Sequence, residues 1–126
     1  MPEITISEAE SRVMEVLWTR APLSADEVVA ALADSTDWHE KTVKTLLNRL
    51  LRKGALHHER DGRRYLYSPA VRREDYVSQE SRTLIERLFG GRVAPMLAHL
   101  QEHEQLKPDD VLALRKLLDD IERGQS

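Results

Sequence analysis

One segment of 29 residues constrains the fold of this 126-residue chain more than any other. It spans residues 41–69 and reads KTVKTLLNRLLRKGALHHERDGRRYLYSP. Five apolar residues recur in its first half at the spacing of one helical face: Val43, Leu46, Leu47, Leu50 and Leu51. Lys53 and Gly54 then close the helix, because glycine readily adopts the left-handed conformation found after helix ends. The first half therefore predicts an amphipathic basic helix.

The second half of the segment predicts a β-hairpin. Residues 56–60 and 65–67 alternate on either side of Asp61-Gly62. An Asp-Gly pair is typical of a two-residue type I′ turn, in which both central residues need positive φ. Three arginines then crowd the tip: Arg60, Arg63 and Arg64. A basic helix followed by a hairpin with a cationic tip is typical of a winged helix, whose hairpin, the wing, contacts the phosphate backbone.

The polar face of the predicted helix carries side chains suited to nucleic acid. Cations suit phosphates, and short hydrogen-bonding side chains suit base edges in the major groove. The candidate DNA-binding residues are Lys41, Thr42, Lys44, Thr45, Asn48, Arg49 and Arg52 on the helix and Arg60, Arg63 and Arg64 on the hairpin. The alternative is a solvated surface helix packed on an unrelated hairpin.

The distribution of charge favours nucleic-acid binding over that alternative. The chain has a net charge of −3, yet residues 38–68 hold 8 basic and 3 acidic residues. Residues 1–37 hold 2 basic and 8 acidic residues, and residues 69–126 hold 9 and 11. A mildly acidic protein that concentrates positive charge in one stretch has a directed electrostatic surface.

Two helices are predicted before the basic segment. Ser7 with Glu10 and Ser24 with Glu27 have the spacing of capping boxes at helix starts. Residues 21–23 predict a short extended piece between the two helices. The resulting order is helix, short strand, helix, helix, strand, turn, strand, which is the order of a winged helix-turn-helix.

Residues 70–126 predict three further amphipathic helices, separated by breaks at Gly90-Gly91 and around Pro108. Their apolar faces exceed what three short helices can bury alone. We therefore expect a mainly α fold with a small β-hairpin, in which residues 1–69 form a winged-helix DNA-binding domain and residues 70–126 a helical dimerisation domain. The residues expected in the dimer contact are Leu84, Leu88, Leu114, Leu117 and Ile121. The alternative is that the helices pack back on the N-terminal half.

Composition excludes several classes of protein. The chain has no cysteine, hence no disulfide and no thiolate metal site. Its longest apolar runs fall far short of the ~20 residues that span a bilayer, so no membrane insertion is expected. The acidic start of the chain lacks the apolar region of a signal peptide, which predicts a cytoplasmic protein.

Residues 99–103 match the H-x-x-E-H pattern of some zinc peptidases, with His99 and His103 on one helix face. No third ligand is evident in the sequence, and there is no large domain to form a cleft. A solvated helix face is the favoured interpretation, so we expect neither an enzyme nor a metal or other cofactor.

The stretch T-V-x-T-L-L-x-R-L-x-x-K-G-A-L-x-H, followed by D-G-R and Y-x-Y-S-P, resembles the BlaI/MecI/CopY family of bacterial repressors. The resemblance covers nearly the whole chain. It implies a homodimer that binds an inverted-repeat operator in promoters of β-lactam-resistance or copper-handling genes. The DNA-contacting residues of the family match Lys41, Thr42, Thr45 and Arg49.

Two departures from the family concern the inducing signal. Members that sense β-lactams are inactivated by a membrane sensor metalloprotease, which cleaves an Asn-Phe bond; the corresponding bond here is His99-Leu100. The copper-sensing branch carries a cysteine-rich motif, which this chain lacks. The sequence thus predicts a homodimeric repressor of an inducible antibiotic- or metal-resistance operon. The alternative is a winged-helix protein-interaction module that does not bind DNA.

Overall fold

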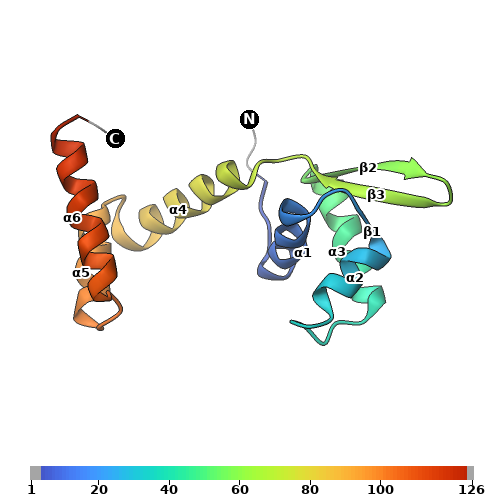
Figure 1. Cartoon of the computed structure of the whole chain (residues 1–126), viewed down its shortest axis with the longest axis horizontal. Helices are drawn as coiled ribbons and strands as arrows, with labels where there is room; N and C mark the ends of the chain where they lie inside the picture. The colour runs from blue at the N-terminus through green and yellow to red at the C-terminus, as the bar shows by residue number, and fades with distance from the viewer. Residues whose placement is uncertain (1–3, 125–126) are drawn as a thin grey trace. The chain divides into compact units, whose positions relative to one another are not determined.

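The computed structural model describes residues 4–124 (Figure 1). Its elements follow the predicted order: α1 (Glu8–Thr19), β1 (Leu23–Ser24), α2 (Ala25–Leu32), α3 (Glu40–Lys53), β2 (Leu56–Asp61), β3 (Arg64–Pro69), α4 (Arg73–Phe89), α5 (Val93–Glu102) and α6 (Pro108–Glu122). The chain divides into two compact units, and the division falls within α4, between Gln79 and Glu80. The predicted fold class, mainly α with a winged helix-turn-helix, is confirmed.

Both predicted capping boxes are present at the starts of α1 and α2. Ser7 Oγ accepts from the Glu10 backbone N at 3.1 Å, and the Ser7 backbone N donates to Glu10 Oε1 at 2.8 Å. Ser24 and Glu27 repeat the arrangement at 3.2 and 2.9 Å. Each box satisfies backbone N–H groups that a helix start leaves without partners, which fixes where the helix begins.

The strands form one antiparallel sheet in the order β1-β3-β2. β2 and β3 make the predicted hairpin, with Leu56 opposite Pro69 and Asp61 opposite Arg64. The short extended piece predicted near residue 23 is β1, whose Leu23 pairs with Tyr67. Local sequence predicted both parts but not their pairing, which depends on how α1 and α2 fold back onto the wing.

The turn of the hairpin corrects one prediction. Its central residues are Gly62 and Arg63, one position later than expected, because Asp61 remains in the ladder opposite Arg64. Gly62 has a φ of +66°, whereas neither Asp61 nor Arg63 has a positive φ. A turn with glycine at its first central position needs positive φ only there. Asp61 thus stays in the strand, where its Oδ2 lies 3.3 Å from Nη2 of Arg64.

The core of the first unit lies between α1, α2, α3 and the sheet. The apolar stripe of α3 faces this core as predicted, with Leu51 only partly buried. The buried apolar residues of the described chain all belong to this unit: Ile6, Val13, Met14, Leu17, Leu23, Val28, Leu32, Val43, Leu46, Leu47, Leu50, Ala55, Leu56 and Tyr67.

Residues 70–79 are attached to the first unit. Trp18 Nε1 on α1 donates to the carbonyl oxygen of Val71 at 2.9 Å, and the Trp18 ring lies 5.5 Å from that of Tyr76. Arg73 Nε lies 2.9 Å from Oε1 of Glu15. The predicted domain boundary, after residue 69, therefore lies ten residues before the division within α4. That the two predicted domains fold independently stays a prediction.

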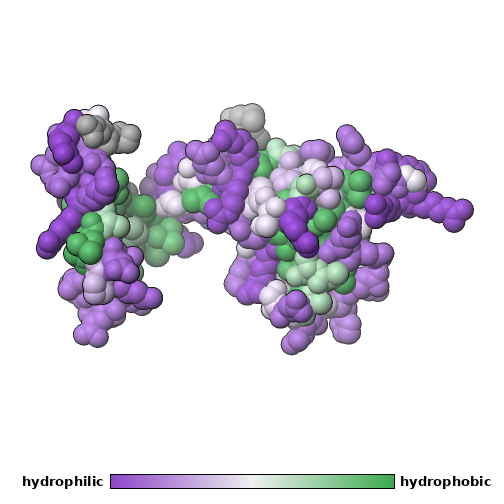
Figure 2. Space-filling model, viewed as in Figure 1, coloured by the Kyte–Doolittle hydropathy of each residue, from purple (hydrophilic) through white to green (hydrophobic). Residues whose placement is uncertain are grey.

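The second unit leaves much of its apolar surface uncovered. None of the described residues of α4, α5 or α6 is buried, and Leu88 and Leu117 are 59% and 50% exposed. Figure 2 shows hydrophobic side chains at the surface of this unit. Proline at the first position of α6 and a hydrogen bond from the Lys107 N to Asp110 Oδ2, at 3.1 Å, set the start of that helix as predicted.

None of the helices within residues 4–124 combines the length and the apolar character that crossing a membrane requires.

Candidate nucleic-acid interface

The polar face of α3 is open to solvent over its whole length. All seven candidate residues of this helix are exposed: Lys41, Thr42, Lys44, Thr45, Asn48, Arg49 and Arg52. The opposite face is buried in the core, so packing of the apolar stripe decides which side chains the helix presents. Gly54, with a φ of +81°, ends the helix in the left-handed conformation expected from the sequence.

Five side chains of this face have no partner in the described part of the protein. No side-chain hydrogen bond or ion pair with residues 4–124 is made by Lys41, Thr42, Asn48, Arg49 or Arg52. Thr45 Oγ1 instead donates to the backbone oxygen of Lys41 at 3.0 Å, a bond within the helix. The unpaired groups carry the hydrogen-bonding capacity that phosphates or base edges would satisfy.

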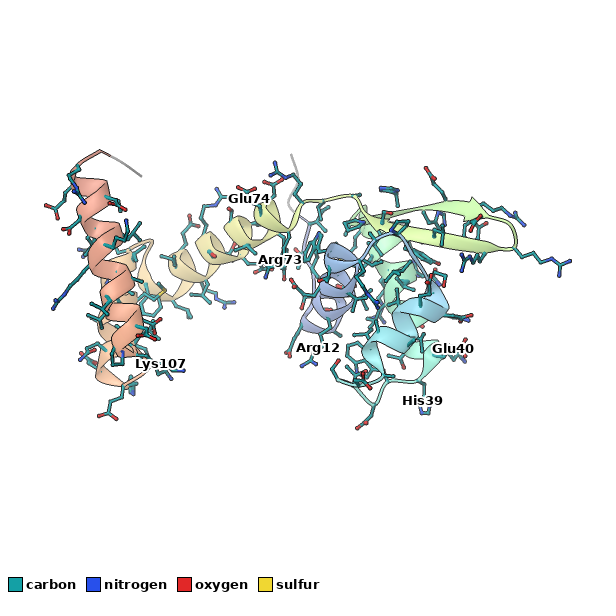
Figure 3. All side chains as sticks on the ribbon, viewed as in Figure 1. Arg12, His39, Glu40, Arg73, Glu74 and Lys107 are labelled. Atoms are coloured by element: carbon teal, nitrogen blue, oxygen red, sulfur yellow. The ribbon has the colours of Figure 1, made fainter. Side chains whose placement is uncertain are left out.

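Lys44 is already paired, which the sequence prediction missed. Its Nζ lies 2.9 Å from Oε1 of Glu40, and both side chains are about half exposed. This hydrogen bond raises the pKa of Lys44 and lowers the pKa of Glu40. The Glu-to-Lys spacing of four residues was the available signal. Glu40 and His39 project outward at the start of α3 (Figure 3), so a carboxylate stands at the edge of the basic face.

The three wing arginines have different surroundings. Arg63, in the turn, forms no hydrogen bond or ion pair with residues 4–124. Arg60 Nε donates to the Gly62 carbonyl oxygen at 3.1 Å, and its guanidinium carbon lies 6.0 Å from the centre of the Tyr65 ring. Arg64 Nη2 lies 3.3 Å from Asp61 Oδ2, and Arg64 Nη1 lies 3.8 Å from Glu27 Oε1 of α2. Within the described chain, Arg63 is therefore the wing arginine without a competing partner.

The structure brings part of the predicted site together around one open hollow. A depression of about 470 Å³ is lined by the start of α2, by Lys44 of α3 and by Arg63 and Arg64 of the wing. Arg64 Nη1 lies 3.8 Å from Glu27 Oε1 across it, which links the end of the wing near its turn to α2. Three predicted cations from two separate elements thus share one surface.

Aromatic contacts stiffen the wing. The His58 and Tyr65 rings stack with centroids 4.4 Å apart, and Tyr67, opposite His58, is buried. Burial raises the pKa of the Tyr67 hydroxyl, so it stays protonated near neutral pH. Cross-strand pairs of this kind keep a two-stranded hairpin ordered without helices on both faces.

The remaining predicted residues lie in the second unit. Leu84, Leu88, Leu117 and Ile121 are exposed, whereas Leu114 is partly buried. His99 and Leu100 lie inside α5, so the bond between them is part of a helix. His103 is the C-cap residue directly after α5, so only His99 of the predicted pair lies within the helix, although the two ring centroids are 4.5 Å apart. No cluster of three or more metal-binding side chains occurs among the described residues.

Comparison with known proteins agrees with this geometry. The chain is 33% identical to the penicillinase repressor of Bacillus licheniformis over 115 residues, which cover 91% of this chain and 90% of that protein. It is 29% identical to the methicillin resistance regulatory protein MecI of Staphylococcus aureus over 113 residues, or 90% of this chain and 92% of the relative.

A solved structure matches the winged-helix part. It is the solution structure of Bacillus licheniformis BlaI, in monomeric form, in complex with the blaP half-operator. The match has a TM-score of 0.53 at 40% identity and covers 60% of this chain and 94% of that chain. The penicillinase repressor family model matches residues 6–120, nearly the whole sequence. The chain therefore belongs to the penicillinase repressor family.

Proposed function

We propose that this protein is a sequence-specific DNA-binding transcriptional repressor that acts as a homodimer on an inverted-repeat operator. One observation carries the proposal: the basic, exposed face of α3 and the cationic wing belong to the same unit. That unit is similar to BlaI, whose structure was solved in complex with a half-operator. Its place of action is the cytoplasm, where the operator lies. The regulated genes form an inducible operon of the antibiotic- or metal-resistance type.

In this proposal α3 is the recognition helix. Lys41, Thr42, Thr45 and Asn48 occupy its first and middle turns, the part of such a helix that reaches base edges in the major groove. Arg49 and Arg52 lie further along the same exposed face and contact phosphates. Lys44 joins them once the approach of a phosphate competes with Glu40 for its amine.

Replacing Asn48 by alanine is expected to lower affinity for the operator by about 1–3 kcal/mol while leaving affinity for random duplex DNA unchanged. An amide at this position can read a base edge, whereas random DNA offers mainly phosphate contacts. Fluorescence anisotropy with both duplexes measures the two affinities. Ser11→Ala, at a partly buried position of α1 outside the interface, is the matched control. Equal losses on both duplexes would remove Asn48 from base reading.

The wing arginines are expected to affect how strongly DNA affinity depends on salt concentration. Arg63→Ala should weaken binding to every DNA sequence alike and reduce the slope of log K against log salt by about 0.9, the value for one lost phosphate contact. Arg115→Ala, an exposed arginine on α6, changes the charge equally and should leave the slope unchanged. A folded Arg63→Ala variant with the wild-type slope would place the wing outside the interface.

The second unit supports the proposed homodimer. Its helices expose Leu84, Leu88, Leu117 and Ile121, and exposed apolar patches on this scale mark association surfaces. A two-fold pair of recognition helices also matches an inverted repeat, because the symmetry of the operator mirrors that of the dimer. Leu114, the fifth residue expected in the dimer contact, is partly buried.

Proteolysis by a membrane sensor metalloprotease is the proposed route of inactivation, with His99-Leu100 as the candidate bond. His99 is exposed, but the bond lies in the last turns of α5. Proteolytic nicking favours exposed, locally open chain. Cleavage there therefore requires the end of α5 to open, and removal of α6 would then dismantle the proposed dimer surface.

A further inference from the structure

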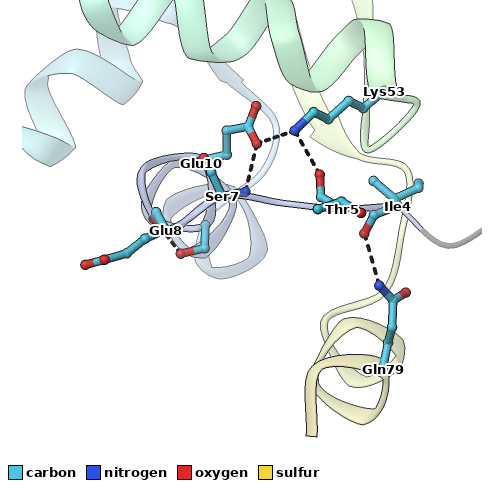
Figure 4. A network of polar contacts seen from close by, with 8 residues as sticks. Ile4, Thr5, Ser7, Glu8, Glu10, Lys53 and Gln79 are labelled. Atoms are coloured by element: carbon cyan, nitrogen blue, oxygen red, sulfur yellow. Dashed lines mark hydrogen bonds and ion pairs between the residues drawn. The ribbon is translucent and has the colours of Figure 1, made fainter. Parts of the chain in front are cut away.

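Lys53 is a cation of α3 that does not belong to the exposed basic face. It is the last residue of the helix, and its Nζ donates to the carbonyl oxygen of Thr5 at 2.8 Å and to Oε1 of Glu10. The Glu10 side chain is only 2% exposed, whereas the Lys53 side chain is 36% exposed, so the cation reaches from the surface to a buried carboxylate. The end of the recognition helix is thereby tied to the segment that leads into α1 (Figure 4).

Glu10 joins the end of α3 to the start of α1. Its Oε1 accepts a hydrogen bond from Lys53 and a second from the Ser7 backbone N at 2.8 Å. Charge-assisted hydrogen bonds to a carboxylate are shorter and stronger than neutral ones. The contact therefore fixes Lys53, and with it the end of α3, against the segment that precedes α1.

The same segment is held on its other side by α4. Gln79 Nε2 donates to the carbonyl oxygen of Ile4 at 3.1 Å (Figure 4). Ile4 and Thr5 are neighbours, so the carbonyl oxygen bound from α4 and the one bound from α3 belong to adjacent residues. Ile6, which follows them, is buried in the core and anchors the segment directly after the two contacts.

The first two turns of α4 are themselves fixed on α1. The Trp18–Val71 hydrogen bond and the Arg73–Glu15 ion pair hold the beginning of the helix, and Gln79 adds a contact about two turns later. From residue 80 the chain continues through the rest of α4 into the second unit. Residues 4–7 therefore contact both the end of α3 and the first two turns of α4, within the first unit.

We propose that residues 4–7 form a brace between α3 and the first two turns of α4, and that Lys53 and Gln79 are positioning residues for paired half-sites. The inference rests on the proposed homodimeric function. Two recognition helices must meet half-sites about one helical turn, roughly 34–36 Å, apart. A recognition helix held firmly against α4 keeps both helices of a dimer in register with those half-sites. Binding to a single half-site does not depend on the distance between two recognition helices.

The test uses the full chain and duplexes obtained by selection from random DNA with the wild-type protein. Three probes are compared: two half-sites at the selected spacing, the same with one inserted base pair, and a single half-site. The variant is Gln79→Leu, which removes the donor to Ile4 at a partly exposed position. Asp75→Asn, one turn earlier on α4 and exposed, is the control.

For Gln79→Leu we expect unchanged affinity for the single half-site and an affinity about fivefold lower for two half-sites at the selected spacing. This factor corresponds to the net contribution of one neutral hydrogen bond. The ratio of affinities between the selected spacing and the spacing with one inserted base pair should become smaller in Gln79→Leu. In Asp75→Asn this ratio should equal that of the wild-type protein. Equal losses on all probes, or no loss on any, would overturn the brace. Wild-type protein that selects no sequence over random DNA would instead overturn the proposed function.

Discussion

A fragment ending at Gln79 is expected to fold, to stay monomeric and to bind the operator about 10²–10⁴-fold more weakly than the full chain. A single winged helix makes few phosphate contacts, whereas two joined units bind the second half-site at high effective concentration. The fragment retains every residue of the buried core. Sedimentation gives the association state, and anisotropy titrations on operator and half-site duplexes give the affinities.

The choice of Gln79 as the end point follows from the contacts of residues 70–79. A shorter fragment ending at Pro69 would lose the Val71 carbonyl that accepts from Trp18 and the packing of Tyr76 on Trp18, and is expected to be less stable.

In the full chain, Leu88→Glu should weaken the dimer and lower the affinity for the operator, while the affinity for a single half-site stays unchanged. A dimeric 1–79 fragment, or one with the operator affinity of the intact protein, would contradict the proposed role of the second unit.

Replacing Lys53 by methionine is expected to lower the free energy of unfolding of the first unit by about 1–3 kcal/mol, because the buried Glu10 carboxylate loses its cation while it keeps the hydrogen bond from Ser7. Both tryptophans of the chain, Trp18 and Trp38, lie in this unit, so urea titrations followed by tryptophan fluorescence report its unfolding. Arg52→Met removes an exposed cation from the neighbouring position and should change stability by no more than about 0.5 kcal/mol.

The same ion pair predicts a pH dependence. Burial by itself raises the pKa of Glu10, but the hydrogen bonds from Lys53 and Ser7 outweigh burial and bring the pKa below its ordinary value of 4.5. A carboxyl group with a lowered pKa stabilises the fold above pH 4.5, and this contribution is lost as the pH falls through the lower folded-state pKa. The stability gap between wild type and Lys53→Met should therefore narrow below pH 4.5. A gap that stays constant from neutral to acidic pH would show that it does not arise from the ion pair with Glu10.

Local patterns determined most of the elements of this protein. The two capping boxes set the starts of α1 and α2, the apolar period set the buried face of α3, and Gly54 set its end. These signals act within a few residues, through backbone hydrogen bonds and the geometry of one helix, so the sequence alone reveals them. The exposed face that carries the candidate DNA-binding residues follows directly from the buried one.

Contacts between distant residues were decided only by the tertiary structure. The pairing of β1 with β3, the ion pair between Lys53 and Glu10 and the hydrogen bond from Gln79 to Ile4 join residues more than 40 positions apart. Such partners depend on how the helices pack, and no local period encodes them. Even the one-residue shift of the wing turn reflects the ladder between β2 and β3, which keeps Asp61 opposite Arg64 and leaves positive φ to Gly62 alone.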